Sequence, residues 1–167
     1  EENFVKHLEK NNYLLEDSIS SSIVKPHGGK LINRVAPNYI DNKNINSLEK
    51  IKLSNNQRLD LELIAIGAYS PLQGFMLKSE LESVLNTLRL PNGILWPIPI
   101  VLDISIEESI KINEGDTVAL VGSLNKVIGV INVEEKYFFD KNVIAEKFYE
   151  SDDLNHPGIK ISNSLKP

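Results

Sequence analysis

Few side chains of this 167-residue chain have the type and spacing that chemistry requires. The tripeptide His27-Gly28-Gly29 joins an imidazole to a glycine pair, and successive backbone amides can converge on a phosphate or sulfate. The favoured interpretation is a tight turn in which His27 binds backbone and packs at an interface. We therefore treat His27, Gly28 and Gly29 as a candidate anion or interdomain contact.

Two more residues belong to this set of candidates. Arg58 lies four residues before Glu62, which predicts an intrahelical ion pair and leaves a partner-domain contact as the alternative. His156 precedes a Pro-Gly pair, which is typical of a turn and leaves a ligand role as the alternative. Both are added to the candidate contacts.

Motifs for other chemistry are missing from the sequence. There is no P-loop and no dinucleotide-binding glycine motif, and the three histidines are isolated from one another. Ser70 stands before a proline and not in a Gly-x-Ser-x-Gly elbow, so it indicates a turn and not a nucleophile. The residues therefore predict no catalytic residue and no metal site in this chain.

Composition narrows the class of protein. Hydrophobic residues at 41% and charged residues at 25% are typical of one globular domain. A net charge of -5 argues against a nucleic-acid partner. The absence of cysteine excludes disulfides and thiol chemistry and fits a cytoplasmic protein. No apolar run is long enough to span a membrane, so no membrane partner is expected.

Two helices are predicted in the middle of the chain. The first covers residues 54–67, because Ser54 and Gln57 match a capping box and Gly67 is a natural terminator. The second covers residues 77–89. The side chains expected to be buried are Leu59, Leu63 and Ile66 in the first helix, and Leu77, Leu81, Val84, Leu85 and Leu88 in the second.

Short β-branched runs predict strands around these helices. The four runs are residues 30–35, 98–104, 117–121 and 126–133, of which the last two form a hairpin. A final helix is expected after Asp140. This pattern indicates an α+β domain built on a small barrel or a strongly curved sheet.

A set of motifs, each weak alone, occurs in one order along the chain and resembles sulfate adenylyltransferase (ATP sulfurylase). The motifs are Pro26-His27-Gly28-Gly29-Lys30-Leu31, Asp60-Leu61-Glu62-Leu63-Ile64-Ala65-Ile66-Gly67, Tyr69-Ser70-Pro71-Leu72-Gln73-Gly74-Phe75-Met76, Trp96-Pro97-Ile98-Pro99-Ile100, Gly115-Asp116-Thr117-Val118-Ala119-Leu120 and His156-Pro157-Gly158. They cover almost the whole chain, from about residue 26 to residue 158.

The resemblance implies the family's N-terminal domain, a PUA-like small β-barrel with flanking helices. It would cover residues 26–167, after a lead-in segment over residues 1–25. In the family a catalytic domain follows, which binds ATP with magnesium and joins it to sulfate to give adenosine 5′-phosphosulfate and pyrophosphate.

The catalytic motif of the family, Gln-x-Arg-Asn-Pro, is missing from these residues. The resemblance therefore predicts a structural fragment that is non-catalytic alone, whose partners are its own catalytic domain and other copies in a homo-oligomer. A freestanding PUA-like module that binds RNA or a nucleotide is the alternative.

Overall fold

The computed structural model describes residues 24–36, 45–140, 143, 144 and 147. Predictions for the lead-in and for His156 lie outside these residues. In chain order the described elements are the 3-10 turns η1 (His27–Gly29) and η3 (Ile45–Ser47), strand β1 (Lys50–Lys52), helices α2 (Asn55–Ala65), α3 (Lys78–Thr87) and α4 (Ile106–Ser109), and strands β2 (Thr117–Val121) and β3 (Val127–Asn132).

A small mixed sheet is formed by the three strands, in the order β1-β2-β3. The predicted hairpin is confirmed: β2 and β3 pair antiparallel, with Thr117 opposite Asn132 and an irregularity between Leu120 and Val121. Strand β1 was not expected, and it pairs parallel to β2 with Ile51 opposite Leu120. All of β2 after Thr117 is buried, so the side chains on both faces of this central strand are covered.

Helix α2 begins at the predicted capping box. Ser54 Oγ accepts from the Gln57 amide at 3.3 Å, and Gln57 Oε1 accepts from the Ser54 amide at 2.8 Å. The buried face of α2 is opposite to the predicted face. Gln57 and Ile64 are buried, whereas Leu59 and Ile66 are 47% and 58% exposed.

The cause of this rotation is the Gln57 side chain. Its Nε2 donates to the backbone oxygen of Asp103 at 2.7 Å and to the Asp103 carboxylate at 2.8 Å. A buried amide that satisfies three hydrogen bonds fixes the face of the helix, even though an apolar residue would be the usual occupant.

Two apolar clusters form the core. The first packs α3, through Leu81 and Val84, against Trp96 and its neighbours; the second packs β1 and β2 around Ile112. Phe75 packs against both clusters. Helix α3 matches its predicted extent, although Leu88 ends it in the left-handed region and is 47% exposed.

Two predicted strands are wrong. Residues 30–35 and 98–104 lie outside the described sheet. Pro99 has no amide to donate to a strand ladder, and residues 30–35 bind to α2 and to the turn after it instead. The described residues form a sheet with helices, as an α+β domain requires, and within them no closed barrel is seen.

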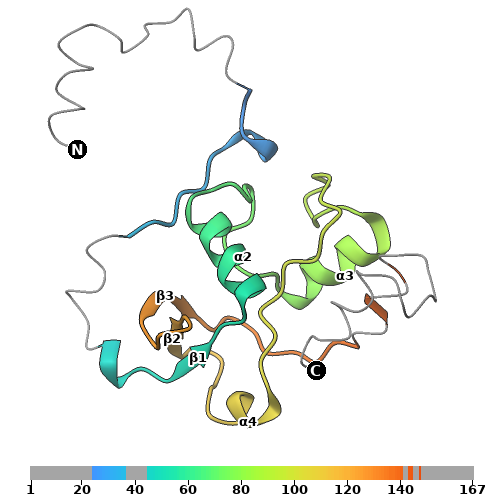
Figure 1. Cartoon of the computed structure of the whole chain (residues 1–167). Helices are drawn as coiled ribbons and strands as arrows, with labels where there is room; N and C mark the ends of the chain where they lie inside the picture. Colours follow the sequence, from blue (N-terminus) through green and yellow to red (C-terminus); the bar gives the residue numbers. More distant parts are fainter. Residues whose placement is uncertain (1–23, 37–44, 141–142, 145–146, 148–167) are drawn as a thin grey trace, which may run out of the picture.

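The elements are arranged around α2, as Figure 1 shows. Residues 24–36 lie at the C-terminal end of α2, where the Arg34 amide donates to Ala65 O at 2.8 Å. Helix α4 lies beyond the other end, below the sheet. In the described part of the chain no helix is long and apolar enough to cross a membrane.

Candidate functional site

Three family-like motifs, far apart in sequence, meet at one point of the surface. The His27 Nε2 donates to Leu95 O at 2.6 Å, so the neutral ring carries its proton on that nitrogen. The His27 and Trp96 rings lie 6.0 Å apart, and Tyr69 meets Trp96 edge-on at 5.7 Å. We call this meeting point the motif junction.

Gly28 is needed there because its backbone lies very close to the side chains of Pro71 and Ile94. Its φ is +74°, and an added Cβ would lie 2.9 Å from Pro71 Cβ and 3.2 Å from Ile94 Cδ1. Only glycine combines this backbone angle with this contact. Gly28 therefore lets the turn at residues 26–29 pack closely against Pro71 and Ile94.

The hydroxyl of Ser70 is part of the backbone network. It accepts from the Ile32 amide at 2.9 Å and donates to Gly67 O at 2.6 Å, and the residue is 3% exposed. A buried hydroxyl with both roles filled is a structural group. The expectation that Ser70 belongs to a turn is confirmed.

A half-buried carboxylate lies behind the junction. Tyr69 OH donates to Asp60 Oδ1 at 3.2 Å. Burial raises the pKa of Asp60 above its ordinary value, and the hydrogen bond from Tyr69 opposes this rise. Burial also raises the pKa of Tyr69, and the Asp60 charge adds to the rise. The pair links α2 to the ring that packs on Trp96.

The candidate residues do not form one site. His27, Gly28 and Gly29 are all exposed at the motif junction, where the Gly29 amide donates to Pro26 O at 2.8 Å and so serves the turn itself. Arg58 forms the predicted intrahelical ion pair with Glu62 on α2. The fifth candidate, His156, lies outside the described residues.

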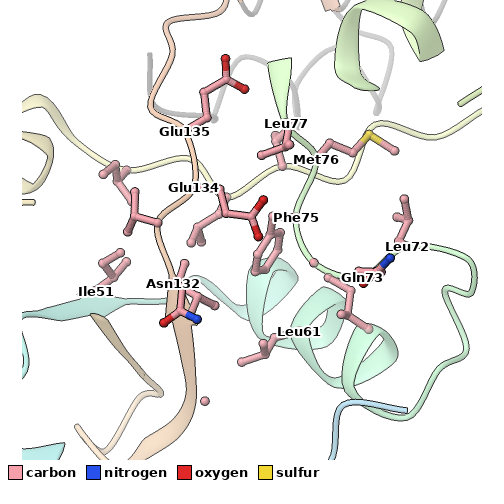
Figure 2. Close-up of a pocket in the computed structure, with 18 of the residues that line it drawn as sticks. Ile51, Leu61, Leu72, Gln73, Phe75, Met76, Leu77, Asn132, Glu134 and Glu135 are labelled. Carbon is pink, nitrogen blue, oxygen red and sulfur yellow. The ribbon is translucent and has the colours of Figure 1, made fainter. Parts of the chain in front are cut away.

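A cleft that sequence reasoning missed runs between α2, the sheet and the segments 71–77 and 132–139. Its volume is about 1420 Å³. Figure 2 shows the Phe75 ring inside it, with the Glu134 carboxylate beside the ring and Leu61 of α2 below. The walls come from segments far apart in sequence, so no local pattern could have predicted the cleft.

One edge of the cleft is held by residues 134–137. Glu135 accepts from the Lys78 amide at 2.9 Å, where its negative charge meets the N-terminus of α3. Tyr137 OH donates to Met76 O at 2.7 Å. Burial, with the charges of Glu135 and Glu80, raises the pKa of Tyr137 to about 12. This phenol therefore stays protonated and acts as a fixed donor.

The contacts described at the motif junction and at the cleft are ring packing and hydrogen bonds. Within the described ranges no group of three or more His, Asp or Glu residues could hold a metal ion. The lining of the cleft is mostly apolar and includes both acidic residues and the cations Arg34 and Lys136. At the motif junction the exposed His27 ring has its Nε2 bound to Leu95 O.

Comparison with known proteins shows the family to which the chain belongs. Residues 24–166 match the model of a PUA-like domain. The sulfate adenylyltransferase of Synechococcus sp. (strain JA-3-3Ab) is 36% identical over 147 residues, and that of Persephonella marina is 40% identical over 146 residues. These matches cover 86% and 85% of this chain.

The chain spans only 37% and 38% of the length of these two relatives. Among solved structures, the hexameric APS kinase from Thiobacillus denitrificans is similar, with a TM-score of 0.63 and 27% identity. That match covers 70% of this chain and 24% of the other. The resemblance seen in the motifs is thus confirmed: this chain belongs to the PUA-like domain family and is related to a part of sulfate adenylyltransferases.

Proposed function

We propose that this chain is the N-terminal domain of an enzyme that makes adenosine 5′-phosphosulfate and pyrophosphate from ATP and sulfate. The observation that carries the proposal is identity of 36% to 40% over about 85% of the chain to sulfate adenylyltransferases. The domain, taken as residues 26–167 after a lead-in over residues 1–25, supports catalysis without supplying reacting groups.

Within that enzyme the domain is a packing partner of the catalytic domain. The motif junction supports this role, because three motifs converge there and leave His27 exposed. We propose His27, Gly28, Gly29, Arg58 and His156 as contacts to that domain. ATP, sulfate and magnesium would bind the catalytic domain, and the enzyme would be a homo-oligomer in the cytoplasm. We expect the three described strands to be part of a small PUA-like barrel.

A chimera tests the proposal. The segment of the Persephonella marina enzyme that matches this chain is replaced by the chain itself, and sulfate-dependent release of pyrophosphate from ATP is measured. We expect the chimera to be active and the chain alone to be inactive. The parent enzyme and a parent that lacks the segment are the controls.

Two results would contradict the proposal. A folded chimera without activity would show that this domain does not serve such an enzyme. Activity of the chain alone would show that it carries reacting groups. The freestanding RNA-binding module is tested in parallel by fluorescence anisotropy with single-stranded RNA at low salt, where we expect no binding by an acidic chain.

The individual contacts are tested in the same chimera. His27→Ala removes the ring at the junction, and we expect a loss of activity or thermal stability that appears only when the catalytic domain is present. Calorimetry of the chain with sulfate distinguishes the anion-site alternative. Heat that disappears in His27→Ala would favour that alternative over the interdomain contact.

A further inference from the structure

The turn that follows α3 carries the only Asn-Gly pair in the sequence, Asn92-Gly93. The Gly93 amide donates to Leu90 O at 2.8 Å, which closes a turn with Pro91 and Asn92 at its two central positions. The Leu90 amide in turn donates to Ile94 O at 2.9 Å. Both members of the pair are exposed. The pair therefore stands at the tip of a short hairpin, where water has access to it.

The surroundings of Gly93 are open. Its φ is +84°, and in the described part of the chain no atom beyond its chain neighbours lies within 4 Å of an added Cβ. Asn92 Oδ1 accepts from the Ile94 amide at 3.1 Å, so the side-chain amide is folded back onto its own backbone. The side-chain carbonyl of Asn92 and the next backbone nitrogen are thus neighbours, with no side chain on Gly93 to keep them apart.

We propose that Asn92 is a site of spontaneous deamidation. The Gly93 amide nitrogen attacks the side-chain carbonyl carbon of Asn92, and a new C–N bond closes a five-membered succinimide. The bond from that carbon to the side-chain nitrogen breaks, and ammonia leaves with the proton from the Gly93 nitrogen. Water then opens the ring at either carbonyl and leaves aspartate or isoaspartate at position 92. Water is the only co-reactant.

The folded turn slows this reaction. The Gly93 nitrogen must leave Leu90 O before it can attack, and turning the side-chain amide of Asn92 toward it removes Oδ1 from the Ile94 amide. Two hydrogen bonds of about 1 kcal/mol each make the folded chain about 30-fold slower than the unfolded chain. Arg89 Nη1 also donates to Gly93 O at 2.8 Å and holds the turn closed. The rate of deamidation therefore reports the local opening of this turn.

The product at position 92 acts on the motif junction. Isoaspartate carries the main chain through an additional carbon, so the hairpin cannot keep the register in which Arg89 lies opposite Leu95. Leu95 O is the acceptor for the His27 ring. Deamidation in the turn therefore loosens the support of His27, although no residue of the junction is itself modified.

Peptide mapping by mass spectrometry tests the modification. The chain is incubated in mildly alkaline buffer, folded or in urea, and is then digested with trypsin. Residues 90–111 follow Arg89, end at Lys111 and contain one asparagine and no glutamine. We expect this peptide to gain about one dalton and to split into two products on chromatography. The gain should be about 30-fold faster in urea.

An internal control lies in the next peptide, residues 112–126. Its Asn113 and Asn125 are followed by Glu114 and Lys126, whose side chains hinder closure of the ring. We expect no gain of mass there over the same time in the folded chain. Residues 90–111 without a gain of mass, or both peptides gaining mass at the same rate, would overturn the proposal.

The variant Asn92→Gln tests the consequence for the fold. Its side chain is one carbon longer and does not form the five-membered ring, so peptide 90–111 should keep its mass. We expect Tm of the incubated chain to fall by about 3–6 °C, the loss of one or two hydrogen bonds, and Tm of incubated Asn92→Gln to stay unchanged. An unchanged Tm in the deamidated chain, or an equal fall in the variant, would overturn the link to the motif junction. No activity is measured, so the result is independent of the chimera test.

Discussion

Replacing Gly67 by alanine should destabilise the domain far more than its position after α2 suggests. The residue has φ +80°, and an added Cβ would lie 2.8 Å from the backbone oxygen of Ile32 and 2.8 Å from Leu31 Cδ1. Because a backbone atom cannot move aside as a flexible side chain does, residues 31 and 32 must shift. Gly93 is the matched control, since its φ is +84° and no atom lies within 4 Å of its added Cβ.

The expected magnitude follows from these contacts. At Gly93 the alanine methyl adds only the left-handed backbone cost, about 1 kcal/mol after the gain from a less flexible unfolded chain. At Gly67 the shift also breaks two hydrogen bonds, from the Ile32 amide to Ser70 and from the Arg34 amide to Ala65. Each is worth about 1 kcal/mol, so the total cost is about 3 kcal/mol.

Thermal unfolding followed by circular dichroism measures the difference. For a domain of this size each kcal/mol lowers Tm by about 3 °C, so we expect a fall of about 9 °C for Gly67→Ala and about 3 °C for Gly93→Ala. Hydrogen exchange of the Ile32 and Arg34 amides should accelerate only in Gly67→Ala. Equal falls in Tm, or unchanged exchange at these two amides, would refute the reasoning.

Three further predictions concern α2 and its contacts. Gln57→Ala removes three hydrogen bonds from a buried position and should lower the free energy of unfolding by about 2–3 kcal/mol in urea titration. Ile64→Ala should cost about 2–4 kcal/mol, whereas Leu59→Ala, at a side chain 47% exposed, should cost less than about 1 kcal/mol in the same assay. Asp60→Asn should stabilise the domain at pH 7 and lose this advantage as pH falls, because the folded state raises the pKa of Asp60 and so favours its neutral form.

The direction of the Asp60→Asn effect follows from the raised pKa of Asp60 in the folded state. A raised folded pKa gives stability that is full below the unfolded pKa and is lost as pH rises through the folded pKa. The neutral Asn keeps an acceptor for Tyr69 and has no such loss. An advantage that grows at low pH would contradict the assignment. Equal costs at Leu59 and Ile64, or no cost at Gln57, would contradict the observed face of α2.

Local patterns predicted the elements whose determinants are adjacent in sequence. The Ser54 and Gln57 capping box located the start of α2, and the β-branched runs located the β2–β3 hairpin. The start of α4 has the same signature, since Ser105 and Glu108 form a capping box, but the four-residue helix is too short to show a periodic pattern. Strand β1 also has only three residues and is defined by its pairing with β2.

Local sequence patterns could not predict contacts between segments that are distant in sequence. The sequence could not show that Gln57 is buried and Leu59 exposed, because the partner of Gln57 is Asp103, which lies 46 residues away. The sequence marked His27, Gly28 and Gly29, but their meeting with Pro71 and Leu95 depends on the folded path of the chain. The cleft beside Phe75 has the same origin.

Phe75 packs against both apolar clusters of the core, one built around α3 and the other around the sheet. A side chain shared in this way makes the two clusters thermodynamically dependent on each other, because neither can open without exposing the same ring. The helical half and the sheet half of the domain should therefore unfold as one cooperative unit, with matching hydrogen-exchange free energies for core amides on both sides of the ring.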